Sequence, residues 1–162
     1  MQFIKFICPL ITVRDISISR KFYESILNQK VKFDFGANVT FHGDFSIHLD
    51  SHFRDLIDNR EIVRGGNDFE LYFENDDLVE FVEVLIKNQV ELVHPLREQP
   101  WKQRVVRFYD PDRHIIEVGE SMEHVAYRLS TEGMSETEIS KSIMIPVEFV
   151  KKSILSFSKE IN

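Results

Sequence analysis

The chain has 162 residues, of which 43% are hydrophobic and 14 are phenylalanine, so it can bury a real core and is not a disordered chain. Its formal net charge of -7 and pI near 5.4 argue against a nucleic-acid-binding surface, because phosphate contacts require clustered Lys and Arg. The single cysteine, Cys8, cannot form an internal disulfide, which fits a reducing cytoplasm. The apolar N-terminal run is interrupted by Lys5 and closed by Arg14 and Asp15, too short and too charged for a signal peptide or a membrane span. We therefore expect a cytoplasmic protein.

The first fifty residues predict one strand, one helix and three further strands. Residues 3–13 predict the opening strand, and Asp15 is placed to cap the helix that follows. In this helix Ile18, Phe22 and Ile26 recur at a spacing of four, which puts them on one buried face. Short strands follow at 30–36, 38–42 and 45–50.

The same order returns in the second half of the chain. The segment FELYF at 69–73 alternates apolar and polar residues, as a strand with one buried face does, and Asp76 or Asp77 caps the next helix. The buried stripe of that helix comprises Leu78, Phe81, Val82 and Leu85. Strands near 90–94, 103–109 and 114–119 complete the unit. The chain is thus an internal duplication with modules at about 1–50 and 68–120, joined by a connection through residues 51–67.

The duplication selects candidate site residues. Cys8 and Glu70 each lie seven residues before the aspartate that caps the following helix, so we expect them at equivalent positions on the first strand of each module. His48 and Glu117 each lie between two apolar residues on the last strand of a module. These four residues would face one another across a pseudo-twofold axis.

Three segments of the chain are distinctive: LITVRDISISRKFYESIL, FELYFENDD and PWKQRVVRFYDPDRHIIEV, the last of which holds the strand, DPD turn and strand that place Glu117. Taken together, they resemble the vicinal oxygen chelate superfamily, which includes glyoxalase I, bleomycin-resistance proteins and extradiol dioxygenases. The resemblance covers about residues 3–120. It implies an α+β fold in which two βαβββ modules curl into an open barrel around one cavity. The domain would span residues 1–121, with a helical extension over 122–162.

The resemblance implies that Glu117 ligates a metal wherever a metal is used. One divalent metal, zinc, nickel, manganese or iron, would then be held by Cys8, His48, Glu70 and Glu117, which offer sulfur, nitrogen and oxygen donors. Glu70 or Glu117 would act as the base of a metal-dependent lyase, isomerase or dioxygenase whose substrate chelates the metal through two neighbouring oxygens.

In the metal-free alternative, Cys8 is a buried small residue and the two carboxylates pair with a base such as Arg104 or Arg107. The cavity would then bind an aromatic or hydrophobic small molecule, as the resistance-type relatives do by sequestration. Arg104 would be a polar contact of this ligand. The candidate walls are Phe35, Phe41, Tyr72 and Trp101. We favour this binding protein over the enzyme.

The residue after the DPD turn departs from the family. Relatives commonly carry glycine at this position, whereas this chain has Arg113. A left-handed backbone at Arg113 would cost about 1 kcal/mol, so we predict a different turn.

The last forty residues have a helical pattern. Helices are predicted at 122–132, 135–142 and 146–157, and Ser135 with Glu138 predicts a capping box. Their order resembles a helix-turn-helix, which leaves open a ligand-responsive regulator, but residues 123–162 hold five Lys or Arg against six Glu and so offer no basic face for phosphate. We expect these helices to cover the domain or a dimer interface, since members of the family commonly form homodimers.

Overall fold

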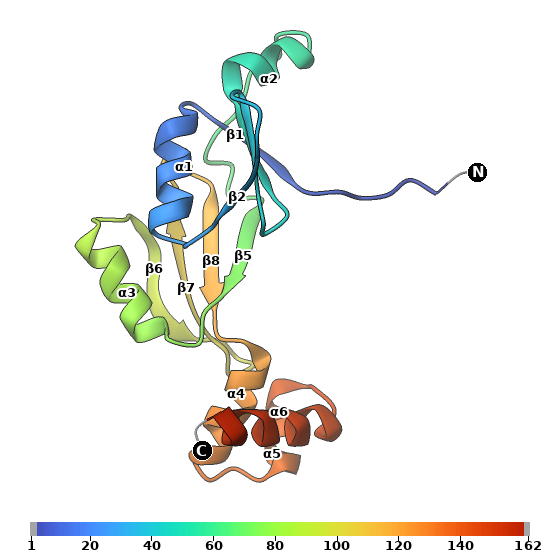
Figure 1. Ribbon diagram of the computed structural model, residues 1–162. Helices are drawn as coiled ribbons and strands as arrows, with labels where there is room; N and C mark the ends of the chain where they lie inside the picture. Colours follow the sequence, from blue (N-terminus) through green and yellow to red (C-terminus); the bar gives the residue numbers. More distant parts are fainter. Residues whose placement is uncertain (1–2, 161–162) are drawn as a thin grey trace. The chain divides into compact units, whose positions relative to one another are not determined.

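The computed structural model describes residues 3–160 (Figure 1). The chain divides into two compact units. The first contains the residues up to Phe69 together with Tyr109–His114, and the second contains Glu70–Phe108 together with the residues from Ile115 onward. One four-stranded sheet belongs to each half of the chain. The fold is therefore of the α+β class.

The sheet of the first half has the strand order β1-β4-β3-β2, with β1 parallel to β4 and the other neighbours antiparallel. Its elements are β1 (Leu10–Val13), α1 (Ile16–Ser25), β2 (Val31–Asp34), β3 (Asn38–Phe41) and β4 (Ser46–Leu49), followed by α2 (Asp50–Leu56). Helix α1 connects β1 to β2, as expected for a βαβββ module.

The second half repeats this order as β5-β8-β7-β6, again with its first and last strands parallel (Figure 1). Its elements are β5 (Glu70–Glu74), α3 (Leu78–Lys87), β6 (Leu92–Glu98), β7 (Arg104–Tyr109) and β8 (Ile115–Gly119). The chain ends in α4 (Met122–Thr131), α5 (Glu136–Ile143) and α6 (Val147–Glu160). The duplicated βαβββ topology and the C-terminal helices predicted from the sequence are confirmed.

Side-chain caps define where the helices begin. Asp15 accepts a hydrogen bond from the backbone N–H of Ile18 at 3.0 Å, and Asp77 accepts one from Glu80 at 3.2 Å, so each module begins its helix in the same way. Ser135 and Glu138 form the predicted capping box. The predicted stripe of the second-module helix is confirmed for Leu78, Phe81 and Leu85 of α3, which are buried, whereas Val82 is only half-buried.

The first strand is shorter than predicted. Only Leu10–Val13 form β1, because β1 pairs with β4 and the pairing starts at Leu10 opposite Ser46, the first residue of β4. Residues 3–9 lie outside the strand.

The predicted connection at 51–67 also contains a helix that the sequence pattern did not predict. Helix α2 has no side-chain cap at Leu49, so the usual signal for a helix start is absent.

Helix α1 buries a different face from the predicted one. Ile18 is 58% exposed, whereas Ser19 and Tyr23 are buried. The reason is the turn between β7 and β8, which belongs to the first unit. Tyr23 donates from its hydroxyl to Asp110 at 2.8 Å, and Ser19 donates to Asp112 at 3.0 Å. Burial, followed by the nearby Asp110 charge, raises the pKa of Tyr23, so its phenol stays protonated and acts as the donor.

The DPD turn keeps the left-handed backbone at its last position. Arg113 has φ of 72°, so the prediction of a different turn is wrong. The Arg113 guanidinium carbon lies 4.0 Å from the centre of the Tyr109 ring, a cation–π contact that offsets part of the backbone cost.

Substitutions of Arg113 separate these two effects. Arg113→Ala keeps the left-handed strain and loses the ring contact, whereas Arg113→Gly loses both. We expect Arg113→Gly to be more stable than Arg113→Ala by about 1 kcal/mol, because glycine adopts positive φ without a Cβ clash. Urea denaturation of the two variants measures the difference, and equal stabilities would contradict a strained backbone.

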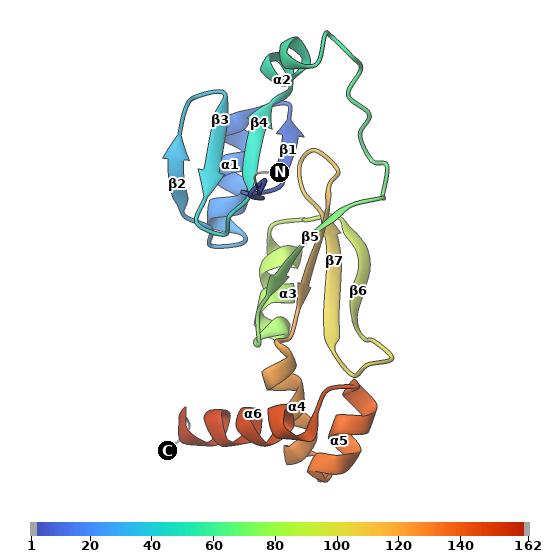
Figure 2. The ribbon, with the colours of Figure 1, turned by 90° about the vertical axis from the view of Figure 1, so that its right-hand side faces the viewer.

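The C-terminal helices have a hydrophobic cluster of their own. It consists of Val125, Ala126, Leu129, Ile139, Ile143 and Val150. The three helices pack on one another through these residues and follow directly from β8 (Figure 2). Over residues 3–160, no helix is both long and apolar enough to cross a membrane.

Candidate ligand-binding face of the second sheet

The two faces of strand β5 differ in character. Leu71 is buried on the face where α3 packs. On this side the centre of the Phe81 ring lies 5.9 Å from the centre of the Phe108 ring. Glu70, Tyr72 and Glu74 alternate with the apolar residues and lie on the opposite face. Tyr72 is 47% exposed there and is the cross-strand neighbour of Glu117 on β8. The predicted alternation of β5 is confirmed, and it produces an accessible polar face.

Arg107 of β7 joins the two carboxylates on this face. Its Nε donates to Glu70 Oε2 at 2.9 Å, and its NH2 forms an ion pair with Glu117 Oε2. Glu117 is 5% exposed, so it needs this partner, because a buried carboxylate without a counter-charge or hydrogen bonds is costly. The predicted pairing of the carboxylates with a base is confirmed for Arg107.

The environment of Glu117 acts on its protonation in two directions. Burial raises the pKa of Glu117, Arg107 opposes this by lowering it, and the nearby Glu70 charge raises it again. The net result is a pKa above the ordinary value of 4.5. Glu117 is thus a carboxylate whose charge depends on the guanidinium beside it.

His94 of β6 completes the cluster from the other side of Arg107. Its Nδ1 lies 2.8 Å from the carbonyl oxygen of Pro95, which can only accept, so Nδ1 carries the proton. The other ring nitrogen, Nε2, then accepts from Arg107 NH1 at 3.3 Å. The guanidinium therefore contacts an imidazole nitrogen as well as two carboxylates.

Trp101 and Tyr72 are held by one residue, Gln103. The Trp101 indole N–H donates to Gln103 Oε1 at 2.9 Å, and Gln103 Nε2 donates to the Tyr72 hydroxyl at 2.9 Å. Tyr72 donates in turn to Glu74 at 2.9 Å. Burial and this acceptor raise the pKa of Tyr72 far above its ordinary value, so the phenol is neutral. Two aromatic side chains predicted to contact a ligand are thus fixed by hydrogen bonds on the second unit.

The register of the first sheet changes one predicted equivalence. Leu10 and Tyr72 both lie five residues before the aspartate that caps the next helix. Leu10 pairs with Ser46, whereas Tyr72 pairs with Glu117. The residue equivalent to Glu117 is therefore Ser46, and its predicted equivalence with His48 is wrong by two residues.

The corresponding cluster of the first unit has a different chemistry. Ser46 Oγ lies 2.8 Å from Thr40 Oγ1 and 3.6 Å from the sulfur of Cys8, which is partly buried. His48 Nε2 lies 2.7 Å from His52 Nδ1, and burial together with this neighbour lowers the pKa of His48. The first sheet thus presents hydroxyl, thiol and imidazole groups where the second presents charges.

Three other predicted contact residues lie elsewhere. Phe41 is fully buried in the core of the first unit, where its ring stacks on that of Phe45 at 4.8 Å, so it is a core residue and not a ligand wall. Arg104 lies three residues before Arg107 and so on the opposite face of β7, and its guanidinium is 3.8 Å from Glu132. The same alternation, read from the sequence, could have selected Arg107 over Arg104. Phe35 is exposed in the first unit.

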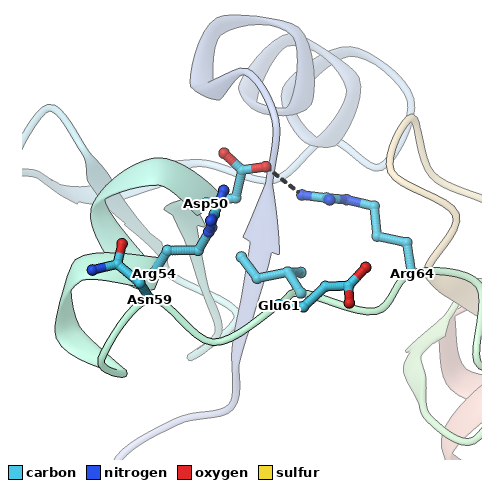
Figure 3. Close-up of a pocket in the computed structure, with 6 residues that line it drawn as sticks. Asp50, Arg54, Asn59, Glu61 and Arg64 are labelled. Atoms are coloured by element: carbon cyan, nitrogen blue, oxygen red, sulfur yellow. Dashed lines mark hydrogen bonds and ion pairs between the residues drawn. The ribbon is translucent and has the colours of Figure 1, made fainter.

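A pocket of about 410 Å³ lies in the first unit, next to α2 (Figure 3). It is lined by Asp50, Arg54, Asn59, Glu61, Ile62 and Arg64. Arg64 is already neutralised, since its guanidinium is 2.7 Å from Asp50. Pockets for organic ligands are mostly apolar, whereas this one offers a single aliphatic side chain. We therefore place the candidate site on the second sheet.

The residues of this face do not fit a resident metal ion. Glu70 and Glu117, the two carboxylates that the family resemblance assigns to a metal, are both bound to the Arg107 guanidinium. Within the part of the chain that the structure describes, no group of three or more His, Cys, Asp or Glu side chains is arranged to hold a metal ion. The cation at this site is supplied by the chain.

Comparison with known proteins identifies the family. Residues 6–123 match the model of the glyoxalase-like domain, so the chain belongs to this family of the vicinal oxygen chelate superfamily. A protein of unknown function from Agrobacterium tumefaciens is 42% identical, with a TM-score of 0.67 over 75% of this chain and 97% of that one. No curated protein matches the chain.

Two more distant crystal structures share the fold alone. A glyoxalase/bleomycin resistance protein/dioxygenase from Nocardioides is 17% identical, with a TM-score of 0.58 over 74% of this chain and 85% of that one. The fosfomycin resistance protein FosX from Mesorhizobium loti is 18% identical, with a TM-score of 0.55 over 74% of this chain and 94% of that one. These similarities agree with the paired βαβββ topology.

Proposed function

We propose that this protein binds a small organic molecule on the polar face of the β5–β8 sheet and does so without a resident metal. The observation that carries the proposal is the position of Arg107, whose guanidinium forms ion pairs with both Glu70 and Glu117. A metal ion would have to displace a positive charge that is already bound to both carboxylates. The binding-protein hypothesis from the sequence thus has more support than the metal-dependent enzyme.

The side chains on this face favour a particular ligand chemistry. Trp101 and Tyr72 offer aromatic surface for a planar or hydrophobic group. Glu70, Glu117 and Arg107 together carry a formal charge of about -1, and the carboxylate of Glu74 lies beside Tyr72. We therefore propose an aromatic ligand that also carries a hydrogen-bond donor or a positive charge, with Glu70 as its acceptor.

Elemental analysis tests the metal-free part of the proposal. The protein is purified without chelator or affinity metal, then titrated by calorimetry with zinc, nickel, manganese and iron(II). We expect no stoichiometric metal in the wild type. In Arg107→Ala the two carboxylates lose their cation. Metal affinity gained in this variant would show that the guanidinium takes the place of a metal ion. One metal per chain in the wild type, lost in Glu117→Ala, would overturn the proposal.

Trp101 provides a direct test of ligand binding, because it is the single tryptophan of the chain. Its fluorescence is followed while matched aromatic compounds with a cationic, neutral or anionic substituent are added. We expect the cationic compounds to bind most tightly and Glu70→Gln to weaken them about tenfold, the loss of one charge-assisted hydrogen bond. Arg104→Ala removes a charge from the other face of β7 and should leave binding unchanged. Equal binding of all three compounds would contradict a role for Glu70.

Assembly and location complete the proposal. We propose a cytoplasmic homodimer, which rests on the family and on the single cysteine. Light scattering coupled to size-exclusion chromatography measures the mass of the assembly, and a mass of one chain at micromolar concentration would contradict the dimer.

A further inference from the structure

The C-terminal helices lie largely outside the family domain. The match to the glyoxalase-like domain ends at residue 123, near the start of α4. The relative from Agrobacterium tumefaciens is covered over 97% of its length by 75% of this chain, so a quarter of this chain has no counterpart in that protein. Helices α4, α5 and α6 are therefore an addition to the glyoxalase-like domain.

One residue of α4 reaches back to the sheet. Arg128 Nε donates to Glu120 Oε1 at 2.9 Å, and its NH2 donates to Glu120 Oε2 at 3.0 Å and to the carbonyl oxygen of Lys102 at 2.7 Å. The side chains of Arg128 and Glu120 are 10% and 3% exposed. A buried, bidentate pair of this kind has a fixed geometry. Arg128 therefore holds Glu120 and the start of the β7 segment together.

Glu120 is also hydrogen-bonded to Gln103 and Arg104, next to the residues of the candidate site. Its Oε2 accepts from the backbone N–H of Arg104 at 2.9 Å, and its carbonyl oxygen accepts from Gln103 Nε2 at 2.7 Å. Gln103 is buried and uses the same amide group to hold Tyr72, while its Oε1 holds Trp101. A continuous set of hydrogen bonds thus runs from helix α4 to both aromatic side chains, all within the second unit.

The side-chain amide of Gln103 is fully engaged within the second unit. Its amide has two N–H donors, and they are used by Tyr72 and by the Glu120 carbonyl. If Glu120 moves, the amide loses one partner and its plane is free to turn, which takes the acceptor away from the Trp101 indole. These hydrogen bonds connect Trp101 to a residue 27 positions further along the chain, Arg128.

We propose that Arg128 is a positioning residue for the ligand-binding face: through Glu120 and Gln103 it orients Trp101 and Tyr72, so the added helices form part of the site. That these aromatic residues contact a ligand rests on the proposed function. The positioning itself does not, and Trp101 fluorescence measures it without any ligand.

The test compares Trp101 emission and its quenching by acrylamide in the wild type and in Arg128→Lys, which keeps the charge but cannot bridge both Glu120 oxygens. We expect emission at longer wavelength and a quenching constant about twofold higher, because the indole N–H loses its fixed acceptor. Lys151→Gln is the matched control, since this lysine pairs on the exposed side of α6 with Glu148 at 3.3 Å. It should change neither quantity.

A second variant removes the Gln103 amide, which joins Glu120 to Trp101 and Tyr72, and leaves the C-terminal helices unchanged. Gln103→Met should change Trp101 emission as Arg128→Lys does, and the double variant should add nothing further, because both act on one set of hydrogen bonds. Should Arg128→Lys not fold, Glu120→Gln weakens the same pair with an isosteric side chain and decides in its place.

The outcomes separate the two proposals. Unchanged Trp101 emission in a folded Arg128→Lys protein, or additive effects in the double variant, would overturn the positioning role and leave Arg128 as a structural residue. A Trp101 response without binding of any aromatic compound would support positioning and contradict the proposed function. A Trp101 response together with weaker binding of the cationic compounds in Arg128→Lys would support both.

Discussion

Replacement of Arg107 by alanine is expected to destabilise the protein by about 2–4 kcal/mol near neutral pH, because it leaves Glu117 buried beside Glu70 without a cation. The loss should depend on pH. Burial and Glu70 raise the pKa of Glu117 above its ordinary value, and Arg107 is the neighbour that lowers it. Without Arg107 the pKa rises further.

The sign of the pH dependence follows from proton binding. Between the ordinary pKa of Glu117 and its higher value in the folded protein, the folded state binds more protons than the unfolded state, so stability falls as pH rises. Removal of Arg107 widens this range. We expect the destabilisation at about pH 5 to be roughly half of that near pH 7.5, because a protonated Glu117 needs no cation. Urea denaturation at the two pH values measures the free energies of unfolding.

Two further variants make this prediction specific. Arg104→Ala removes the same charge from the same strand but breaks only an exposed pair with Glu132 at 3.8 Å, so it should cost less than about 1 kcal/mol at either pH. The double variant Arg107→Ala with Glu117→Gln removes both charges and should recover most of the loss. Equal losses at the two pH values, or no recovery in the double variant, would contradict a buried charge pair.

Replacement of Asp110 by alanine is expected to destabilise the protein by about 3–5 kcal/mol, since four donors lose one buried carboxylate. Asp110 Oδ1 accepts from the backbone N–H groups of Asp112 at 2.9 Å and His114 at 2.8 Å. Its Oδ2 accepts from the Tyr23 hydroxyl at 2.8 Å and from His114 Nδ1 at 2.8 Å. Asp110 is 4% exposed, so water cannot replace these bonds without opening the turn.

Asparagine distinguishes the two oxygens of Asp110. Asp110→Asn keeps an acceptor for the backbone N–H groups but presents an amide NH₂ to Tyr23 and His114, so it should lose about half as much stability as Asp110→Ala. Glu24→Gln on α1, which breaks an exposed pair with Arg20 at 3.1 Å, should change stability by less than about 0.5 kcal/mol. Thermal and urea denaturation report these values. An alanine variant as stable as Glu24→Gln would mean that the turn is not anchored to α1.

The face of α1 shows where local patterns stop being sufficient. The spacing of Ile18, Phe22 and Ile26 predicts an apolar buried stripe, yet the buried residues are Ser19 and Tyr23. Their hydroxyl groups bind carboxylates of the β7–β8 turn, which lies almost ninety residues further along the chain. A helix pattern records which residues are apolar, but it cannot record a distant polar partner.

For the candidate site, too, the local features could be predicted from the sequence, whereas the contacts between distant residues could not. Alternation in FELYF placed Glu70 and Tyr72 on one face, and the DPD hairpin placed Glu117 on β8 next to them. The pairing of Glu117 with Arg107, and the link from Arg128 to Trp101, join residues from different strands and a helix. Gln103, which connects them, has no sequence signal of its own.

Local features could be predicted from the sequence. They are the two modules of one strand, one helix and three strands, the capping residues Asp15, Asp77 and Ser135, the buried stripe of α3 and the polar face of β5. Each depends on periods of two or about four residues and on caps within one turn, so neighbouring residues suffice.

Two features could be read only from the folded structure. One is the register of β1 on β4, which makes Ser46 and not His48 the counterpart of Glu117. The other is the base that pairs with the two carboxylates, Arg107. Strand register and buried ion pairs depend on which distant residues meet once the sheets have formed, and a shift of two residues preserves every local pattern while it changes every partner.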